Sequence, residues 1–298
     1  MRIALINSGI GLLAPAAELH RLRPDADLVL AMDPDGMPWG PRTPDDIAAR
    51  SLACARAAAT GASVLVFACN TGTVHALPAL RAEFEPSIPV VGTVPAIKPA
   101  AACNDPVAIW ATVATTASEY QRRLIADFAG SARVTPVACP GLADAIDAGD
   151  EAATRAGVAD AAARTPADCR AVVLGCTEYE LAAGLIGAAL PGATLFRSAA
   201  AVAAQALRRA AASGADASPP GTPSRTGTVR VLLSGRQAGL PAAALRYSEG
   251  RLLADLVADR PADDRPTDDR ADELRADGRP DDAVAEAARP VLPRSVPA

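Results

Sequence analysis

Two cysteines, Cys69 and Cys176, stand in sequence contexts that look like copies of each other. Each follows a short run of apolar, largely β-branched residues, and each precedes a hydroxyl or amide side chain and then an apolar helical pattern. This order predicts a buried strand, a sharp turn and a helix. The two thiols are therefore expected at the carboxyl ends of strands, which is where open α/β sheets bind their ligands.

Both thiols are also expected at or just before a helix N-terminus, where backbone N–H groups and the helix dipole favour a thiolate over a thiol. A thiolate is able to take a proton from a carbon next to a carboxylate, and a thiol on the opposite side is able to donate one. Two equivalent cysteines in facing halves of the molecule would give a reversible inversion without any cofactor. The alternative is a pair of buried structural cysteines at strand ends.

Strands and helical stretches alternate along most of the chain, and this alternation predicts an α/β fold with a mostly parallel sheet. The expected strands cover residues 2–6, 28–31, 64–67, 89–94, 107–111, 133–138, 172–175, 193–196 and 229–233. The expected helices cover residues 12–22, 43–60, 74–84, 117–129, 179–190 and 198–212, and Ala-rich helical segments are expected on both sides of Asp150. Residues 213–227 are rich in Ser, Gly and Pro and are expected to be a flexible loop. Residues 258–298 form an Asp-, Arg- and Pro-rich tail that is expected to be disordered, because it has too few apolar residues to bury a core.

The composition limits the classes of function. The chain has 298 residues, 50% of them hydrophobic but only 3% aromatic, so Ala, Val, Leu and Ile must build the core. A net charge of −5 gives no electrostatic reason to expect a nucleic-acid partner. No apolar stretch is long enough to span a bilayer, and the first residues are too short for a signal peptide, so we expect no membrane partner and a cytoplasmic location.

The six cysteines are expected to be reduced in such a compartment. None of them forms a C-x-x-C pair, and the chain has only two histidines, so the spacing typical of metal ligands is absent and we expect no metal site.

A rival pattern lies near the start of the chain. Residues 9–14 fit G-x-G-x-x-A between an expected strand and an expected helix, and Asp33 follows at the distance of a ribose-binding acidic residue. An NAD-dependent oxidoreductase is therefore an alternative from a different class of enzyme. A tight turn between a strand and a helix explains the same glycines without a nucleotide.

Seven collinear motifs resemble the aspartate/glutamate racemase superfamily, and its glutamate racemase branch most closely. The motifs are Asn7-Ser8-Gly9-Ile10-Gly11-Leu12, Pro38-Trp39-Gly40, Ala68-Cys69-Asn70-Thr71, residues 89–100, residues 111–115, residues 138–142 and Leu174-Gly175-Cys176-Thr177-Glu178-Tyr179. They span about residues 1–250 and leave the Asp/Arg/Pro-rich tail outside.

The resemblance implies two pseudo-symmetric lobes, each a mostly parallel sheet flanked by helices, with the active site in the cleft between them. Lobe 1 would comprise residues 1–97 and about 206–255, and lobe 2 residues 98–205. Cys69 and Cys176 would be the two acid/base groups, with no cofactor. Substrate-binding residues would be Asn7, Ser8, Trp39, Gly40, Asn70, Thr71, Thr177 and Glu178, and Thr112 and Thr115 would line the same cleft.

The substrate implied is a small acidic amino acid, glutamate first, and the product D-glutamate would feed peptidoglycan synthesis. A homodimer is left open by the sequence. Two positions differ from glutamate racemases, which have Asp at the position of Asn7 and His at the position of Glu178. An amide takes up no proton, whereas Glu178 is able to orient or deprotonate the Cys176 thiol.

The sequence Cys-Thr-Glu is similar to the aspartate racemase branch, so racemisation of aspartate or another acidic amino acid is an alternative. A non-catalytic ligand-binding protein on the same fold is the other alternative, suggested by Asn7 and by the added tail.

Overall fold

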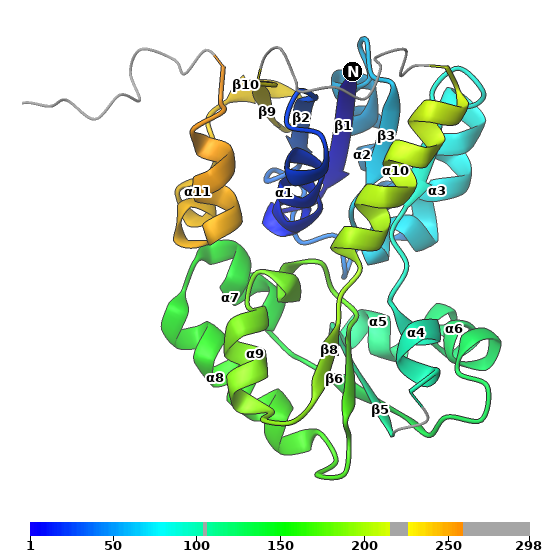
Figure 1. The fold of residues 1–298 in the computed structure, drawn as a ribbon, viewed down its shortest axis with the longest axis vertical. Helices are drawn as coiled ribbons and strands as arrows, with labels where there is room; N and C mark the ends of the chain where they lie inside the picture. Colours follow the sequence, from blue (N-terminus) through cyan, green and yellow to red (C-terminus); the bar gives the residue numbers. More distant parts are fainter. Residues whose placement is uncertain (104–105, 215–225, 259–298) are drawn as a thin grey trace, which may run out of the picture. The chain divides into compact units, whose positions relative to one another are not determined.

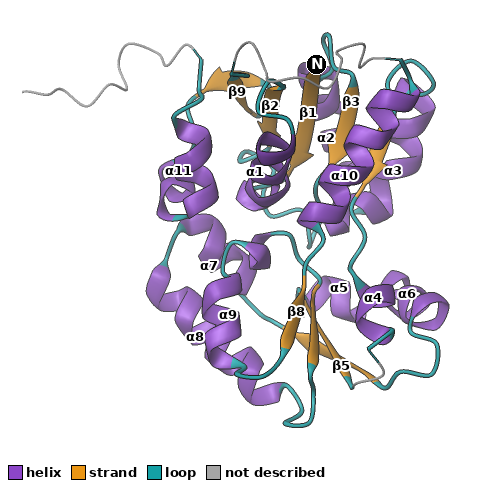
Figure 2. Cartoon of the chain, viewed as in Figure 1, coloured by secondary structure: helices purple, strands orange, loops and turns teal. Residues whose placement is uncertain are grey.

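The computed structural model describes residues 1–103, 106–214 and 226–258, and its strands form two sheets (Figures 1 and 2). The six-stranded sheet has the order β10-β9-β2-β1-β3-β4 and the four-stranded sheet the order β6-β5-β7-β8. All neighbouring strands are parallel except β9 and β10. We call the six-stranded sheet with its helices lobe 1, and the four-stranded sheet with its helices lobe 2. The predicted α/β fold with mostly parallel sheets is confirmed.

The strands of lobe 1 are β1 Arg2–Asn7, β2 Asp27–Met32, β3 Val64–Phe67, β4 Val90–Gly92, β9 Val229–Leu233 and β10 Arg236–Ala238. Its central strands are buried except at the first residue of β1 and of β2, because helices cover both faces of the sheet. One face packs on α1 Leu13–Leu22, α10 Ala199–Ala212 and α11 Ser248–Ala254, and the other on α2 Pro44–Ala58 and α3 Asn70–Phe84. Short 3₁₀ turns, η1 Ile10–Leu12 and η3 Ala242–Arg246, precede α1 and α11.

The strands of lobe 2 are β5 Val107–Ala111, β6 Val134–Ala138, β7 Ala171–Leu174 and β8 Thr194–Phe196. One face packs on α7 Leu142–Ala148, α8 Glu151–Arg164 and α9 Ala183–Ala189, and the other on α4 Ile97–Ala101 and α6 Glu119–Phe128. A short helix, α5 Val113–Ala117, follows β5, and the turn η2 Glu178–Glu180 follows β7. Helix α10 packs against α1, β3 and β4 of lobe 1. The lobe boundaries expected near residues 97 and 206 stay a prediction.

The helix predicted over residues 179–190 is wrong in its first third, residues 179–182. Residues 178–180 form a 3₁₀ turn, and the α-helix begins only at Ala183. All three residues of the turn are buried, since Tyr179 packs in the core and Glu180 accepts hydrogen bonds from the backbone N–H groups of Ser198 and Ala199. These tertiary contacts hold residues 178–180 as a 3₁₀ turn in place of the first turn of the predicted helix.

Two further differences are local. The helix predicted over 117–129 is α6, and a separate short helix, α5, precedes it, because Ser118 ends α5 and caps the N-terminus of α6 with its hydroxyl. The strand β10 and the helix α11 follow β9, the last predicted strand, and were not predicted. The loop expected over 213–227 lies mostly, and the tail expected over 258–298 almost wholly, outside the described residues.

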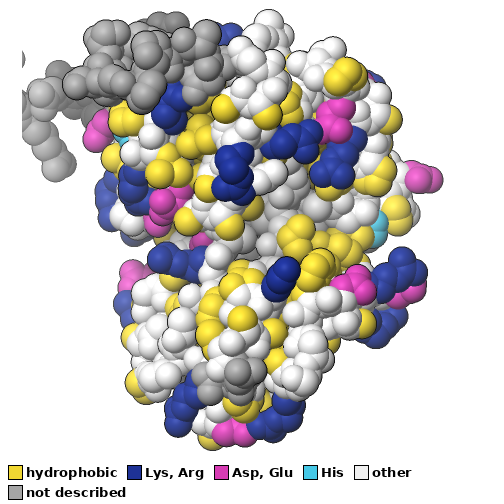
Figure 3. Space-filling view, turned by 45° about the vertical axis from the view of Figure 1, so that its right-hand side comes forward, with side chains coloured by type: hydrophobic (Ala, Val, Ile, Leu, Met, Phe, Trp, Pro, Cys, Tyr) yellow, Lys and Arg dark blue, Asp and Glu magenta, His cyan; other side chains and the backbone are white. Residues whose placement is uncertain are grey.

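Within the described ranges, no helix combines the length and the apolar character needed to cross a membrane. In the face shown in Figure 3, Lys and Arg side chains are scattered among acidic and hydrophobic ones and do not form one continuous basic surface.

Candidate active site

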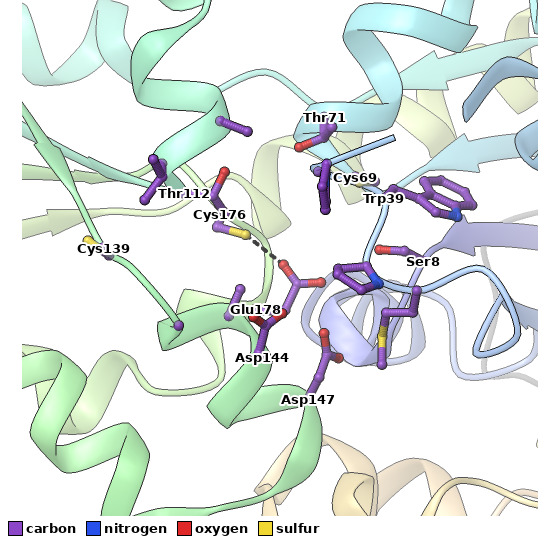
Figure 4. Close-up of a pocket in the computed structure, with 18 of the residues that line it drawn as sticks. Ser8, Trp39, Cys69, Thr71, Thr112, Cys139, Asp144, Asp147, Cys176 and Glu178 are labelled. Carbon is purple, nitrogen blue, oxygen red and sulfur yellow. Dashed lines mark hydrogen bonds between the residues drawn. The ribbon is translucent and has the colours of Figure 1, made fainter. Parts of the chain in front are cut away.

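A cavity of about 440 Å³ lies between the two lobes, at the carboxyl ends of strands from both sheets. The residues after β1, β3, β5, β6 and β7 all contribute to its lining, so the parallel sheets bring distant segments together. Figure 4 shows Ser8, Trp39, Cys69 and Thr71 on one side and Thr112, Cys139 and Cys176 on the other. Both cysteines singled out in the sequence therefore face one space from opposite lobes.

Cys69 lies at the N-terminus of α3, as expected, and is 7% exposed. Its Sγ accepts a hydrogen bond from the backbone N–H of Gly72 at 3.3 Å. Burial, followed by the negative charge of Glu178, raises the pKa of the Cys69 thiol to about 12, although the N–H groups of Gly72, Ser8 and Thr71 oppose the shift.

Cys176 lies between β7 and the turn η2, and its thiol donates a hydrogen bond to Oε2 of Glu178 at 2.7 Å (Figure 4). Burial raises the pKa of the Cys176 thiol well above its usual value, and the charge and hydrogen bond of Glu178 raise it again. At both cysteines, burial and the charge of Glu178 oppose the expected preference for a thiolate. Loss of water around sulfur outweighs the backbone N–H groups.

Three of the expected substrate-binding residues lie behind the cavity wall. Asn7, at the end of β1, is fully buried, and its Nδ2 donates to Thr177 Oγ1 at 3.2 Å and to Glu178 Oε1 at 3.4 Å. Asn70 Nδ2 donates to the carbonyl of Gly175 at 2.8 Å, and its Oδ1 is buried without a hydrogen-bond partner. Asn7, Asn70 and Thr177 therefore join the two lobes next to the cysteines. Ser8, Trp39, Gly40, Thr71 and Glu178 line the cavity itself.

Asp33 holds one wall of the cavity in place. Its carboxylate accepts hydrogen bonds from Trp39 Nε1 at 3.0 Å, from Arg50 Nη1 at 3.2 Å and from Ser234 Oγ at 3.1 Å. Trp39 is 1% exposed and packs on Phe67, with the ring centroids 6.0 Å apart. Because three protein donors already bind this carboxylate, Asp33 has a structural role, and the ribose-binding role of the rival sequence pattern is not needed to explain it.

Asp33→Ala is expected to weaken both the fold and substrate binding. The change leaves the indole N–H of the buried Trp39 without its acceptor, and an unsatisfied buried donor costs about 1–3 kcal/mol. We expect a lower free energy of unfolding in urea titrations and a KM raised about tenfold for the small molecule that the cavity binds. A wild-type KM together with wild-type stability would contradict this role, and Asp45→Ala, on the exposed start of α2, serves as the control.

The sequence analysis missed two acidic residues at the site. Asp147 and Asp144 lie on α7, which follows the Cys139-Pro140-Gly141 strand end, and both line the cavity. Asp147 Oδ1 accepts a hydrogen bond from the backbone N–H of Ile10 at 2.8 Å, across the two lobes. Burial and the nearby charge of Glu178 raise the pKa of Asp147 well above its usual value. Their spacing of three residues on a helix was the available signal.

Among the described residues, no group of three or more His, Cys, Asp and Glu side chains has the arrangement of a metal site. The cavity lining contains no Lys, Arg or His. A substrate carboxylate would therefore be held by hydroxyl and backbone N–H groups, and a substrate ammonium would find Glu178 and Asp147.

Comparison with known proteins agrees with this geometry. The family model described as Asp/Glu/hydantoin racemase matches residues 11–217. The chain belongs to this racemase family. It is 39% identical over 240 residues to the glutamate racemase of Herpetosiphon aurantiacus, covering 78% of this chain and 92% of the relative. It is 36% identical over 216 residues to the glutamate racemase of Pseudomonas putida W619, covering 70% and 80%.

Solved racemase structures share the fold. The Escherichia coli glutamate racemase, in complex with L-glutamate and an activator, matches with a TM-score of 0.68 and 29% identity, over 82% of this chain and 91% of that one. The Thermus thermophilus glutamate racemase, in complex with β-chloro-D-alanine, matches with a TM-score of 0.63 and 27% identity, over 87% and 93%. The predicted membership of the aspartate/glutamate racemase superfamily is confirmed.

Proposed function

We propose that this racemase interconverts L- and D-glutamate without a cofactor, and that the D-glutamate supplies peptidoglycan synthesis. The observation that carries the proposal is that Cys69 and Cys176, from two different lobes, line one cavity of about 440 Å³. The match to curated glutamate racemases over most of the chain supports glutamate as the first substrate.

The mechanism follows from the positions of the two sulfurs. One cysteine, as thiolate, takes the α-hydrogen as a proton, and the electron pair of the C–H bond stays on the α-carbon and its carboxylate. The other cysteine, as thiol, donates a proton to the opposite face and becomes the thiolate. A carbanion protonated from the second face has the inverted configuration, and the next substrate molecule of that configuration reverses the roles.

The cavity wall supplies the groups that would hold the substrate. Ser8, Thr71 and the backbone of Gly40 offer neutral donors for the two carboxylates, and Trp39 shapes the wall beside them. Asn7, Asn70 and Thr177 would act by holding the lobes and the cysteine turns in place. Because no cationic side chain lines the cavity, binding depends on oriented neutral donors, as in other electrostatic sites built from backbone N–H groups.

The deciding experiment is solvent-deuterium incorporation at the α-carbon, followed by NMR. L- and D-glutamate and L- and D-aspartate are offered separately, with no added cofactor. We expect deuterium incorporation with inversion for both glutamate enantiomers. Faster inversion of aspartate would move the substrate to the alternative suggested by Cys-Thr-Glu, and binding without exchange of any of the four would favour a non-catalytic ligand-binding role.

A cytoplasmic location and a homodimer complete the proposal. Cell fractionation tests the first and analytical ultracentrifugation of the full-length chain tests the second.

A further inference from the structure

Glu178 lies at the centre of a buried cluster that the two-cysteine mechanism alone does not explain. Its Oε2 accepts the Cys176 thiol at 2.7 Å, and its Oε1 accepts Asn7 Nδ2 from the other lobe at 3.4 Å. Glu178 is 5% exposed and Asn7 is fully buried. A Cβ atom on Gly11 would lie 2.5 Å from Glu178 Oε1 and 2.7 Å from Asn7 Nδ2, so only glycine lets the turn after β1 pack on this cluster.

We propose that Glu178 is the third acid–base group of the reaction, which holds the one negative charge of the site between turnovers, and that Asn7 is its neutral partner across the lobes. This inference rests on the proposed racemase activity and assigns it a further catalytic residue. Cys69, Cys176 and Glu178 then share two protons and one negative charge.

The argument rests on the cost of a buried charge. Moving the Cys176 proton to Glu178 Oε2 breaks the S–H bond, forms an O–H bond and leaves the number of buried charges unchanged. Losing a thiol proton to water would instead create a new charge inside the protein, which is far more costly. The short thiol–carboxylate hydrogen bond provides the path for this transfer.

The proton balance closes over one turnover. At rest, both cysteines are thiols and Glu178 is a carboxylate. Glu178 takes the Cys176 proton, the Cys176 thiolate takes the α-hydrogen, and Cys69 donates its proton to the other face. Cys69 is then a thiolate and Glu178 a carboxylic acid, and one proton moving from Glu178 to Cys69 restores the resting form.

The two cysteines are therefore unequal. Cys176 has a carboxylate within hydrogen-bond distance, whereas the Cys69 thiolate is stabilised only by backbone N–H groups such as that of Gly72. For the enantiomer whose α-hydrogen faces Cys69, the proton of the Cys69 thiol must first reach Glu178. Unlike Cys176, Cys69 has no direct hydrogen bond to Glu178 that would carry this proton. The equilibrium constant between enantiomers is one, so kcat/KM is equal in the two directions, and the asymmetry is confined to the separate values of kcat and KM.

Asn7 suits Glu178 because an amide donates a hydrogen bond and carries no charge. A carboxylate at position 7 would stand 3.4 Å from Glu178, and two carboxylates at that distance do not both stay ionised in a buried site. The other titratable groups that face Glu178 are Cys69 at the start of α3, Tyr179 in η2 and Asp147 on α7. All of them are acids, so no cation competes for the charge of Glu178.

The test is Glu178→Gln, which keeps the size of the side chain and removes its proton acceptor. We expect kcat at neutral pH to fall about 10²- to 10⁴-fold in both directions, the range usual for a lost acid–base group. We also expect kcat of the variant to rise tenfold per pH unit as hydroxide replaces the missing base. If Glu178 only repelled the thiolate, the variant would ionise Cys176 more easily, and an unchanged or raised kcat at neutral pH would overturn the proposal.

Two controls separate this result from misfolding and from a wrong substrate. Asp127→Asn removes an exposed carboxylate on α6 that does not line the cavity, and we expect it to keep the parental pH profile. Glu178→Ala is expected to regain activity as formate is added, which a misfolded protein would not do, and absence of any rescue would count against the proposal. Racemisation by the parental protein establishes the proposed function independently of either variant.

Asn7 is tested by a double-mutant cycle. Asn7→Asp is expected to lower kcat at least tenfold in the parental protein and to have little further effect in Glu178→Gln, since the repulsion needs both carboxylates. Effects that multiply would mean that Asn7 acts independently of Glu178, and would overturn the pairing.

Discussion

Cys69→Ala and Cys176→Ala are each expected to abolish racemisation. Inversion needs a base on one face of the α-carbon and an acid on the other, and each variant keeps only one of these groups. One acid–base group commonly contributes about 10²- to 10⁴-fold to a rate. Among the residues that line the cavity there is no histidine, and the one further cysteine is Cys139. We therefore expect turnover below the detection limit of polarimetry.

Deuterium incorporation gives the sharper readout for these variants. In each of them, one enantiomer of glutamate still presents its α-hydrogen to the surviving cysteine. Exchange without inversion for that enantiomer, and no exchange for the other, is the pattern that two facing cysteines predict.

The matched control is Cys139→Ala. Cys139 lines the same cavity, and its thiol donates to the carbonyl of Val137 at 3.5 Å. Burial raises its pKa to about 12, and no carboxylate accepts its proton. We expect this variant to keep racemisation within a few fold. Normal inversion by Cys69→Ala or Cys176→Ala would remove the two-base mechanism.

The positions of the cysteines could be predicted because local signals decide them. An apolar β-branched run followed by a helical pattern places a residue at the carboxyl end of a strand, and parallel sheets bring such ends together. Strand β3 and the cap at Cys69 follow this rule, as does β7 before Cys176. Because the pattern occurs twice, it predicts a pair of thiols and not a single one.

The protonation state of the cysteines could not be predicted because distant groups decide it. The helix N-terminus at Cys69 is visible in the sequence, but its burial and the charge of Glu178, more than one hundred residues away, are not. The turn at 178–180 failed for a similar reason. Its backbone is held by contacts of Tyr179 and Glu180 with the Cys139 and Ser198 segments.

Asp147 illustrates a third limit. A carboxylate on an Ala-rich helix reads as a solvated residue, and only the tertiary fold brings it to the backbone N–H of Ile10. The complementary signal was the glycine-rich turn after β1, which we interpreted as a nucleotide motif or a tight turn. In the fold, Asp147 lies beside Gly9 and the Asn7–Glu178 cluster lies beside Gly11, so a Cβ atom at either position would clash with these side chains.

Gly9→Ala is expected to impair catalysis by separating the two lobes at this contact. The added Cβ would lie 2.3 Å from Asp147 Oδ1 and 2.6 Å from Oδ2, so either the turn or the carboxylate must move. Movement of the carboxyl group breaks its hydrogen bond with Ile10, and a typical hydrogen bond contributes about 0.5–1.5 kcal/mol. Movement of the turn displaces Ser8 and the wall beside Cys69. Since a misplacement of about 1 Å costs up to about 10² in rate, we expect kcat/KM to fall between 10- and 100-fold.

Gly184→Ala is the matched control, because a Cβ at this position in α9 meets no atom within 4 Å. Alanine in a helix is favoured over glycine by about 0.5–1 kcal/mol, so this variant should retain activity and unfold at a slightly higher temperature. Asp147→Ala in the Gly9→Ala background removes the side chain with which the new Cβ clashes, and this change also removes the hydrogen bond with Ile10. If the clash is the cause, the double variant has the activity of Asp147→Ala alone, and the two effects do not multiply. Multiplying effects would instead place the damage in the backbone of the turn after β1, and lobe contact through Asp147 would then be irrelevant to the loss.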